Sequence, residues 1–263
     1  MSRTYDLDRA HVFHSWSAQA LIDPLPIASA SGSTFTDYGG KTYLECVDWA
    51  ETHPYLSPRN MPGGERRYGR TPSEMGRFLD AFGCENRPDK VVGFMPTCFA
   101  YRWQTIVEDY PTFNEYVLHI WAAMSHGGKS LWPYAYHDLG DRPALYLGTK
   151  YVFESFKALT DLVLHAKRTD VRRDKDADVV LYTLGDDRMV VAMNYTKSEL
   201  QVAIPAGAGP MREFRGHRVI DTSTSQILLL KPFEVFIATA KPHDAGLRPF
   251  AVVRDEIAAL EKA

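Results

Sequence analysis

The hydrophobic pattern of this chain changes its period near Lys167, and this change limits the folds open to it. Upstream, two apolar or aromatic runs, 91–95 and 130–136, alternate with segments of helical spacing over 112–126 and 151–165. A strand that is apolar throughout is expected to be buried on both faces. The order strand, helix, strand, helix is typical of parallel βα units.

Downstream of Lys167 the pattern predicts an antiparallel β-domain. Residues 168–178 are rich in Arg, Asp and Lys, and we interpret them as a charged loop. Short β-rich runs then follow, separated by Gly-Asp-Asp, Pro-Ala-Gly and Lys-Pro turns. These runs are 179–184, 189–193, 200–204, 226–230 and 234–239.

Together these patterns predict a fold class of α/β plus β. Partial (β/α) barrel-like parallel units are followed by a C-terminal antiparallel β-sandwich. A long loop is expected over 52–72, which holds four Pro and three Gly, and a short helix over 73–82. The predicted domains are an N-terminal segment at 1–44, the barrel-like part at 45–168, the β-domain at 169–243 and a tail with a short helix at 244–263.

The number of βα units raises a packing problem. A complete barrel needs eight units and about 250 residues, whereas 41–166 has room for about three or four units. An open parallel sheet leaves unpaired edges. The chain would then have to pair with a second copy in a homo-oligomer, cover the edges with its N-terminal segment, or fold poorly.

Composition excludes several classes of function. The net charge of −3 provides no general field for attracting nucleic acid or an anionic membrane. No apolar run approaches the roughly 20 residues that span a bilayer. The three cysteines lack metal-ligand spacing, so no metal site is predicted, and their low, odd number favours a reducing compartment. We interpret the protein as cytoplasmic, without a nucleic-acid or membrane partner.

Residues 11–44, HVFHSWSAQALIDPLPIASASGSTFTDYGGKTYL, resemble the N-terminal segment of class III (omega) aminotransferases, which use pyridoxal phosphate. The matching positions are His11, His14, Trp16, Gly32, Asp37, Gly40, Tyr43 and Leu44, and Glu45 stands where that family usually has Asp. The resemblance implies amino-group transfer with pyridoxal phosphate as cofactor. It ends at Glu45, and the Lys that would form the Schiff base has no counterpart in a suitable context.

The βα pattern and the β-domain behind it resemble the C-terminal part of a barrel glycoside hydrolase over about residues 45–241. In such enzymes the last barrel units run directly into an antiparallel β-domain. The aromatic run SLWPYAYHD, after a helix that ends at His-Gly-Gly, is typical of a late barrel strand. The resemblance implies a carbohydrate substrate or ligand and no cofactor.

Hydrolysis of a glycosidic bond requires two carboxylates, about 5–5.5 Å apart for retention or about 6.5–9.5 Å for inversion. Barrel active sites lie at the carboxyl ends of the strands, which selects carboxylates that follow predicted strands. The candidates are Glu51, Glu108, Asp109, Asp138 and Asp141. Turn geometry and helix N-termini also favour acidic residues at such positions.

Aromatic residues close to the same strand ends could stack on sugar rings. They are Trp49, Tyr101, Trp103, Trp132, Tyr134 and Tyr136, with His137 beside them. Burial in the core is the common alternative for strand aromatics.

Three hypotheses follow from the sequence. The first is a glycoside-hydrolase-like protein that acts on or binds carbohydrate through an aromatic-lined cleft with paired carboxylates; its shortened barrel is compatible with an active enzyme and with a truncated, inactive relative. The second is a protein related to class III aminotransferases. The third is a non-catalytic composite of two gene fragments joined near Glu45.

Overall fold

The computed structural model describes residues 13–14, 36–38, 41–42, 49–52, 72–81, 91–98, 111–133, 142–207 and 209–262. The upstream strands are β1 (Phe13–His14), β2 (Thr36–Tyr38), β3 (Lys41–Thr42), β4 (Trp49–Thr52), β5 (Val91–Phe94) and β6 (Ser130–Leu131). The helices are α2 (Pro72–Ala81), α3 (Phe113–Ser125), α5 (Pro143–His165) and α6 (Phe250–Leu260). The downstream strands are β7 (Lys167–Arg173), β8 (Ala177–Leu184), β9 (Asp187–Asn194), β10 (Leu200–Ile204), β11 (Gly209–Glu213), β12 (Val219–Thr222), β13 (Gln226–Leu230) and β14 (Val235–Thr239).

Four short strands form a parallel sheet in the order β1-β4-β5-β6. The outer strand β1 comes from the segment that resembles an aminotransferase, and it pairs with β4 through Phe13 opposite Trp49. Part of the N-terminal segment therefore pairs with the β4 edge, which is one of the three alternatives that followed from the number of βα units. Strands β2 and β3 form an antiparallel pair, with Thr36 opposite Thr42 and Tyr38 opposite Lys41.

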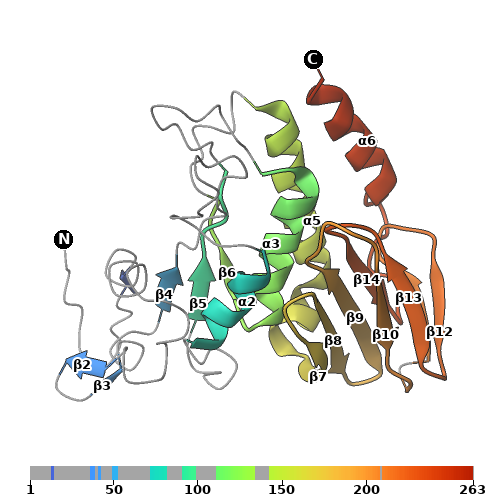
Figure 1. The fold of residues 1–263 in the computed structure, drawn as a ribbon, viewed down its shortest axis with the longest axis horizontal. Coiled ribbons are helices and arrows are strands. Elements are labelled where there is room, and N and C mark those ends of the chain that lie inside the picture. The colour runs from blue at the N-terminus through green and yellow to red at the C-terminus, as the bar shows by residue number, and fades with distance from the viewer. Residues whose placement is uncertain are drawn as a thin grey trace.

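Helices α3 and α5 lie between this parallel sheet and the β-domain (Figure 1). The predicted capping box starts α3: the Glu115 backbone N–H donates to Thr112 Oγ1, and the Thr112 backbone N–H donates to Glu115 Oε2. Gly127, with φ of 98°, ends the helical path as expected. The central turns of α3 are buried on all sides, as expected for a helix sandwiched between two sheets.

The predicted antiparallel β-domain is confirmed. Its main sheet has six strands in the order β12-β11-β14-β9-β8-β7, and β10 and β13 form a separate two-stranded sheet. Successive residues of β9 contribute to two cores: Val191 and Met193 pack with the helices, whereas Val190 and Ala192 pack with β10 and β13 residues such as Val202. The central strands of the sheet, β8, β9 and β14, are thus buried on both faces.

Several boundaries differ from the sequence predictions. The charged loop expected over 168–178 is wrong, because β7 occupies 167–173 at the edge of the sheet, where charged side chains reach solvent. Helix α5 begins at Pro143 instead of Tyr151, because proline is favourable in the first helical turn. The strands β11 and β12 had no clear sequence signal. Strand β6 ends at Leu131, and residues 134–136 of the expected strand lie outside the described residues.

Arg215 joins the β-domain to α5 and to the segment before α6. Its fully buried guanidinium donates to the carbonyls of Tyr151 at 3.1 Å and Arg248 at 2.7 Å, and pairs with Glu154 at 3.4 Å. The guanidinium carbon also lies 4.0 Å from the centre of the Tyr151 ring. These contacts hold the C-terminal segment, and α6 behind it, against α5.

The capping box gives a direct test of the α3 boundary. Thr112→Ala removes the side-chain acceptor for the Glu115 N–H and is expected to lower the free energy of unfolding by about 1 kcal/mol in urea denaturation. Thr160→Ala is the matched control, because Thr160 is an exposed residue in the interior of α5, where Ala is the better helix former. Equal effects of the two substitutions would contradict the capping role.

Candidate functional site

The parallel strands β4, β5 and β6 end at one edge of their sheet, which we call the carboxyl edge. Glu51 of β4 is in register with Gly93 of β5, and Gly93 is in register with Ser130 of β6. The backbone N–H of Trp132, directly after β6, donates to the carbonyl of Phe94 at 3.0 Å. Binding sites of parallel βα folds lie at this end of the strands.

Trp132 is an exposed aromatic residue of the carboxyl edge. Its side chain is 48% exposed, and its indole N–H donates to Ser130 Oγ at 2.7 Å. This hydrogen bond from the preceding strand restricts the rotation of the ring. An indole held in this way exposes a large flat apolar surface, and its ring does not have to be ordered when a ligand binds.

A buried polar cluster connects the end of β5 to the helices behind it. The Tyr116 hydroxyl lies 3.2 Å from Cys98 Sγ and accepts a hydrogen bond from Thr149 Oγ1 at 3.1 Å. Burial, and secondarily the neighbouring Cys98, raises the pKa of Tyr116 well above its ordinary value, so the phenol stays neutral. The cluster fixes the chain after β5 relative to α3 and α5.

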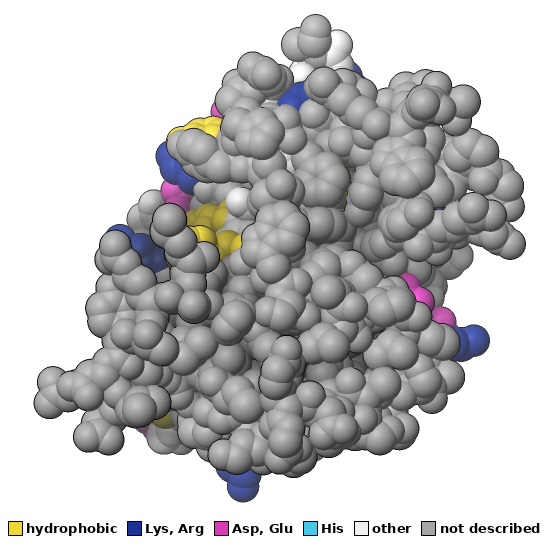
Figure 2. Space-filling model, turned by 90° about the vertical axis from the view of Figure 1, so that its left-hand side faces the viewer, with side chains coloured by type: hydrophobic (Ala, Val, Ile, Leu, Met, Phe, Trp, Pro, Cys, Tyr) yellow, Lys and Arg dark blue, Asp and Glu magenta, His cyan; other side chains and the backbone are white. Residues whose placement is uncertain are grey.

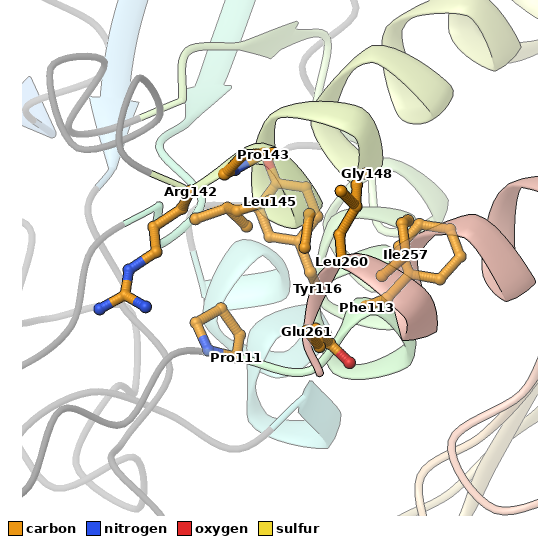
Figure 3. Close-up of a pocket in the computed structure, with 11 residues that line it drawn as sticks. Pro111, Phe113, Tyr116, Arg142, Pro143, Leu145, Gly148, Ile257, Leu260 and Glu261 are labelled. Carbon is orange, nitrogen blue, oxygen red and sulfur yellow. The ribbon is translucent and has the colours of Figure 1, made fainter. Parts of the chain in front are cut away.

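Tyr116 also lines a cavity of about 430 Å³ between the first turns of α3 and α5 and the last turn of α6 (Figure 3). The walls are mostly apolar, and the Arg142 side chain points away from their centre. The lining residues are Pro111, Phe113, Tyr116, Arg142, Pro143, Ala144, Leu145, Gly148, Ile257, Leu260 and Glu261. The cavity lies behind the first turns of the helices and contains none of the predicted site residues.

The structure describes three of the predicted site residues. Trp132 lies at the carboxyl edge, and Glu51 and Trp49 lie in β4, where their backbone register is described. The others, Glu108, Asp109, Asp138, Asp141, Tyr101, Trp103, Tyr134, Tyr136 and His137, lie outside the described residues. The convergence of two carboxylates on one cleft therefore stays a prediction. Figure 2 views the molecule from the side of the N-terminal strands, where the described side chains are a few hydrophobic and charged groups.

Sequence reasoning did not identify the Tyr116–Cys98–Thr149 cluster. The sequence offered one signal, a tyrosine at a core position of an otherwise apolar helix face, because a buried hydroxyl needs hydrogen-bond partners. Among the described residues, no three His, Cys, Asp or Glu side chains come together as a metal site. Within the same part of the chain, no helix is long and apolar enough to cross a membrane.

The solved structures similar to this chain include several glycoside hydrolases. A variant of a family 27 β-L-arabinopyranosidase from Geobacillus stearothermophilus, solved with arabinose, is 12% identical, with a TM-score of 0.50 over 83% of this chain and 48% of that one. An α-amylase from Anoxybacillus is 11% identical, with a TM-score of 0.49 over 65% and 45% of the two chains. A family 30 endoxylanase from Clostridium papyrosolvens is 13% identical, with a TM-score of 0.43 over 87% and 55%.

The likeness to the arabinopyranosidase concerns the fold, in which a βα part is followed by an antiparallel β-domain. The chain spans about half the length of these three hydrolases. No protein-family model matches the sequence, and no curated protein matches it either. None of the three structures is an aminotransferase, so the resemblance of residues 11–44 stays a prediction.

The polar cluster generates a prediction about stability. Tyr116→Phe deletes the hydroxyl that Thr149 and Cys98 contact, and leaves a buried Thr149 donor without this partner. We expect the free energy of unfolding in urea to fall by about 1–3 kcal/mol. Tyr146→Phe on the exposed part of α5 is the matched control and should stay within about 0.5 kcal/mol of the parent protein. A Tyr116→Phe protein as stable as this control would show that the cluster does not hold the fold.

Proposed function

We propose that the protein binds carbohydrate at the carboxyl edge of its parallel sheet, with Trp132 as a stacking platform. The observation that carries the proposal is the half-exposed indole directly after β6, oriented by Ser130. The fold adds support, because the arabinopyranosidase with a similar fold was solved with a sugar bound.

The chemistry of sugars suits this surface. A pyranose ring has one face made largely of C–H groups, and an indole offers a flat apolar surface of similar size. Stacking removes both surfaces from water, which stabilises the complex in proportion to the apolar area buried. Because the Trp132–Ser130 hydrogen bond already restricts the ring, less rotational entropy is lost when a sugar binds.

We further propose that Glu51 supplies one of two catalytic carboxylates, so that the protein hydrolyses a glycosidic bond. Glu51 lies near the end of β4, two strands from Ser130 in register. Neighbouring strands are about 4.8 Å apart, so the backbones of β4 and β6 are separated by about 10 Å, a distance that one oligosaccharide can span. The second carboxylate would come from Glu108, Asp109, Asp138 or Asp141, which follow β5 and β6 in the chain.

Binding can be tested at Trp132. Trp132→Ala is expected to weaken binding to soluble starch, xylan or an arabinopyranoside by about tenfold or more, measured by calorimetry and affinity electrophoresis. Trp132→Phe, which keeps an aromatic face, should retain most of the affinity. Phe153→Ala is the matched control, because Phe153 is an exposed aromatic on α5, away from the carboxyl edge. The proposal is wrong if the parent protein binds none of these probes or if Trp132→Ala and Phe153→Ala bind equally well.

Hydrolysis can be tested at Glu51. Glu51→Gln keeps the size of the side chain and removes its charge, so kcat/KM on chromogenic glycosides should fall by about 10²–10⁴-fold. The control Glu199→Gln changes an exposed acid of the β-domain and should leave turnover unchanged. Binding without turnover by the parent protein would reject the catalytic part alone and favour the truncated, inactive relative.

A further inference from the structure

The imidazole of His126 lies between two carboxylates from different parts of the fold. His126 is the C-cap of α3; its Nδ1 is 2.8 Å from Asp80 Oδ1 at the end of α2, and its Nε2 is 2.8 Å from Asp178 Oδ2 in β8. The side chains of His126 and Asp178 are 5% and 4% exposed, whereas Asp80 is 43% exposed. The ring is thus buried at the boundary between the α2–α3 pair and the β-domain.

The geometry determines the protonation state of this ring. A neutral imidazole has one N–H donor and one acceptor nitrogen, whereas the imidazolium has two donors. Both ring nitrogens of His126 face oxygens of carboxylates, which accept hydrogen bonds. A neutral ring would therefore place a nitrogen lone pair against a carboxylate oxygen in one of the two contacts. The imidazolium, with two N–H donors, can donate a hydrogen bond to each of the two carboxylates.

Charged groups of both signs surround His126. From β7, Arg173 Nη1 lies 3.7 Å from Asp80 Oδ1, and the guanidinium groups of Arg173 and Arg168 donate to the Ser125 carbonyl beside the histidine. From the segment after β9, the Tyr195 hydroxyl donates to Asp178 Oδ2 at 2.6 Å. Three cations, the imidazolium, Arg173 and Arg168, and two anions, Asp80 and Asp178, thus meet at this boundary. Loss of the histidine proton would leave one of the two carboxylates facing a ring nitrogen that carries no proton.

The electrostatics agree with the geometry. Burial alone lowers the pKa of His126, but the hydrogen bonds and charges of Asp178 and Asp80 outweigh it and raise the pKa above its ordinary value. Burial, together with the nearby Asp178 charge, raises the pKa of the Tyr195 hydroxyl well above its ordinary range, so it stays a donor. The histidine is therefore the group of this cluster that loses its charge as the pH rises through its raised pKa.

The cluster also connects α2 to α3 and to the β-domain. Gly76 of α2 packs directly on the histidine ring, since a Cβ at this position would lie 2.3 Å from Nε2. The residues after His126 lead into β6, so the cluster lies at the amino ends of the parallel strands, opposite the carboxyl edge.

We propose that His126 is a pH-sensitive clamp that holds α2 and the end of α3 against the β-domain while its ring is protonated. This inference is independent of the proposed carbohydrate binding. Because the folded-state pKa of His126 is raised, the stabilisation is fully present below the unfolded-state value of about 6.5 and is lost as the pH rises through the folded-state value. Alkaline pH should therefore release α2 first, while the two-sided core of the β-domain stays closed.

Hydrogen–deuterium exchange of the full chain tests the clamp. Between about pH 6 and about pH 9, after correction for the intrinsic rise of exchange with pH, the protection of α2 amides should fall at least tenfold, whereas β9 amides stay protected. His126→Gln, with a single side-chain NH₂ group in place of two opposed N–H donors, should show low α2 protection at every pH. His165→Gln is the matched control, because His165 is an exposed histidine at the end of α5, and it should behave like the parent protein.

A second variant keeps the test decisive if His126→Gln fails to fold. Asp80→Asn changes a partly exposed partner and keeps the contact between His126 and Asp178, so the pH midpoint for release of α2 should move to lower pH. The clamp is rejected if α2 protection in the parent protein does not change with pH. It is also rejected if the midpoint of Asp80→Asn equals that of the parent protein, or if His126→Gln shows the same pH-dependent fall.

Discussion

Burial of the central strands β8, β9 and β14 on both faces of the six-stranded sheet is the constraint on which the rest of the structure depends. Because residues alternate along β9, Val190 and Val191 belong to different cores, one under β10 and β13 and one under the helices. A slip of one residue would exchange the two sets and place every large side chain in the wrong core. The register of β9 with β8 and β14 therefore fixes where α3 and α5 can dock, and these helices in turn carry the parallel strands.

This arrangement gives the parallel sheet two ends with different roles. The amino ends are tied to the β-domain through the His126 cluster, where burial and paired charges provide stability. The carboxyl ends carry the half-exposed Trp132, and the buried contacts of Tyr116 connect the chain after β5 to α3 and α5. In βα folds generally, stability and binding are separated at opposite ends of the strands.

The sequence predicts elements well where the signal is local. The capping box at Thr112 and the apolar face of α3 are both visible in the sequence of one helix. The strands 200–204 and 226–230 have the predicted bounds because turn residues flank them. Strand β7 was missed because its charges conceal an extended segment that only its pairing with β8 defines. The contact of His126 with Asp178 joins residues 52 positions apart, so no local sequence pattern predicts it. For the candidate site, Trp132 follows β6 at the strand end that the position rule selects, and its role in binding stays a prediction. The meeting of the carboxylates depends on loop conformations that periodicity does not encode.

The charges of β7 also bear on how copies of this protein can associate. Lys167, Arg168, Arg172 and Arg173 lie on a seven-residue edge strand with one acidic residue, Asp170. If two copies paired their β7 strands antiparallel, Lys and Arg of one copy would face Arg and Lys of the other, and like charges directly opposite one another destabilise a sheet. The charges of β7 thus disfavour edge-to-edge association of two sheets. A homo-oligomer of this chain would need a different surface.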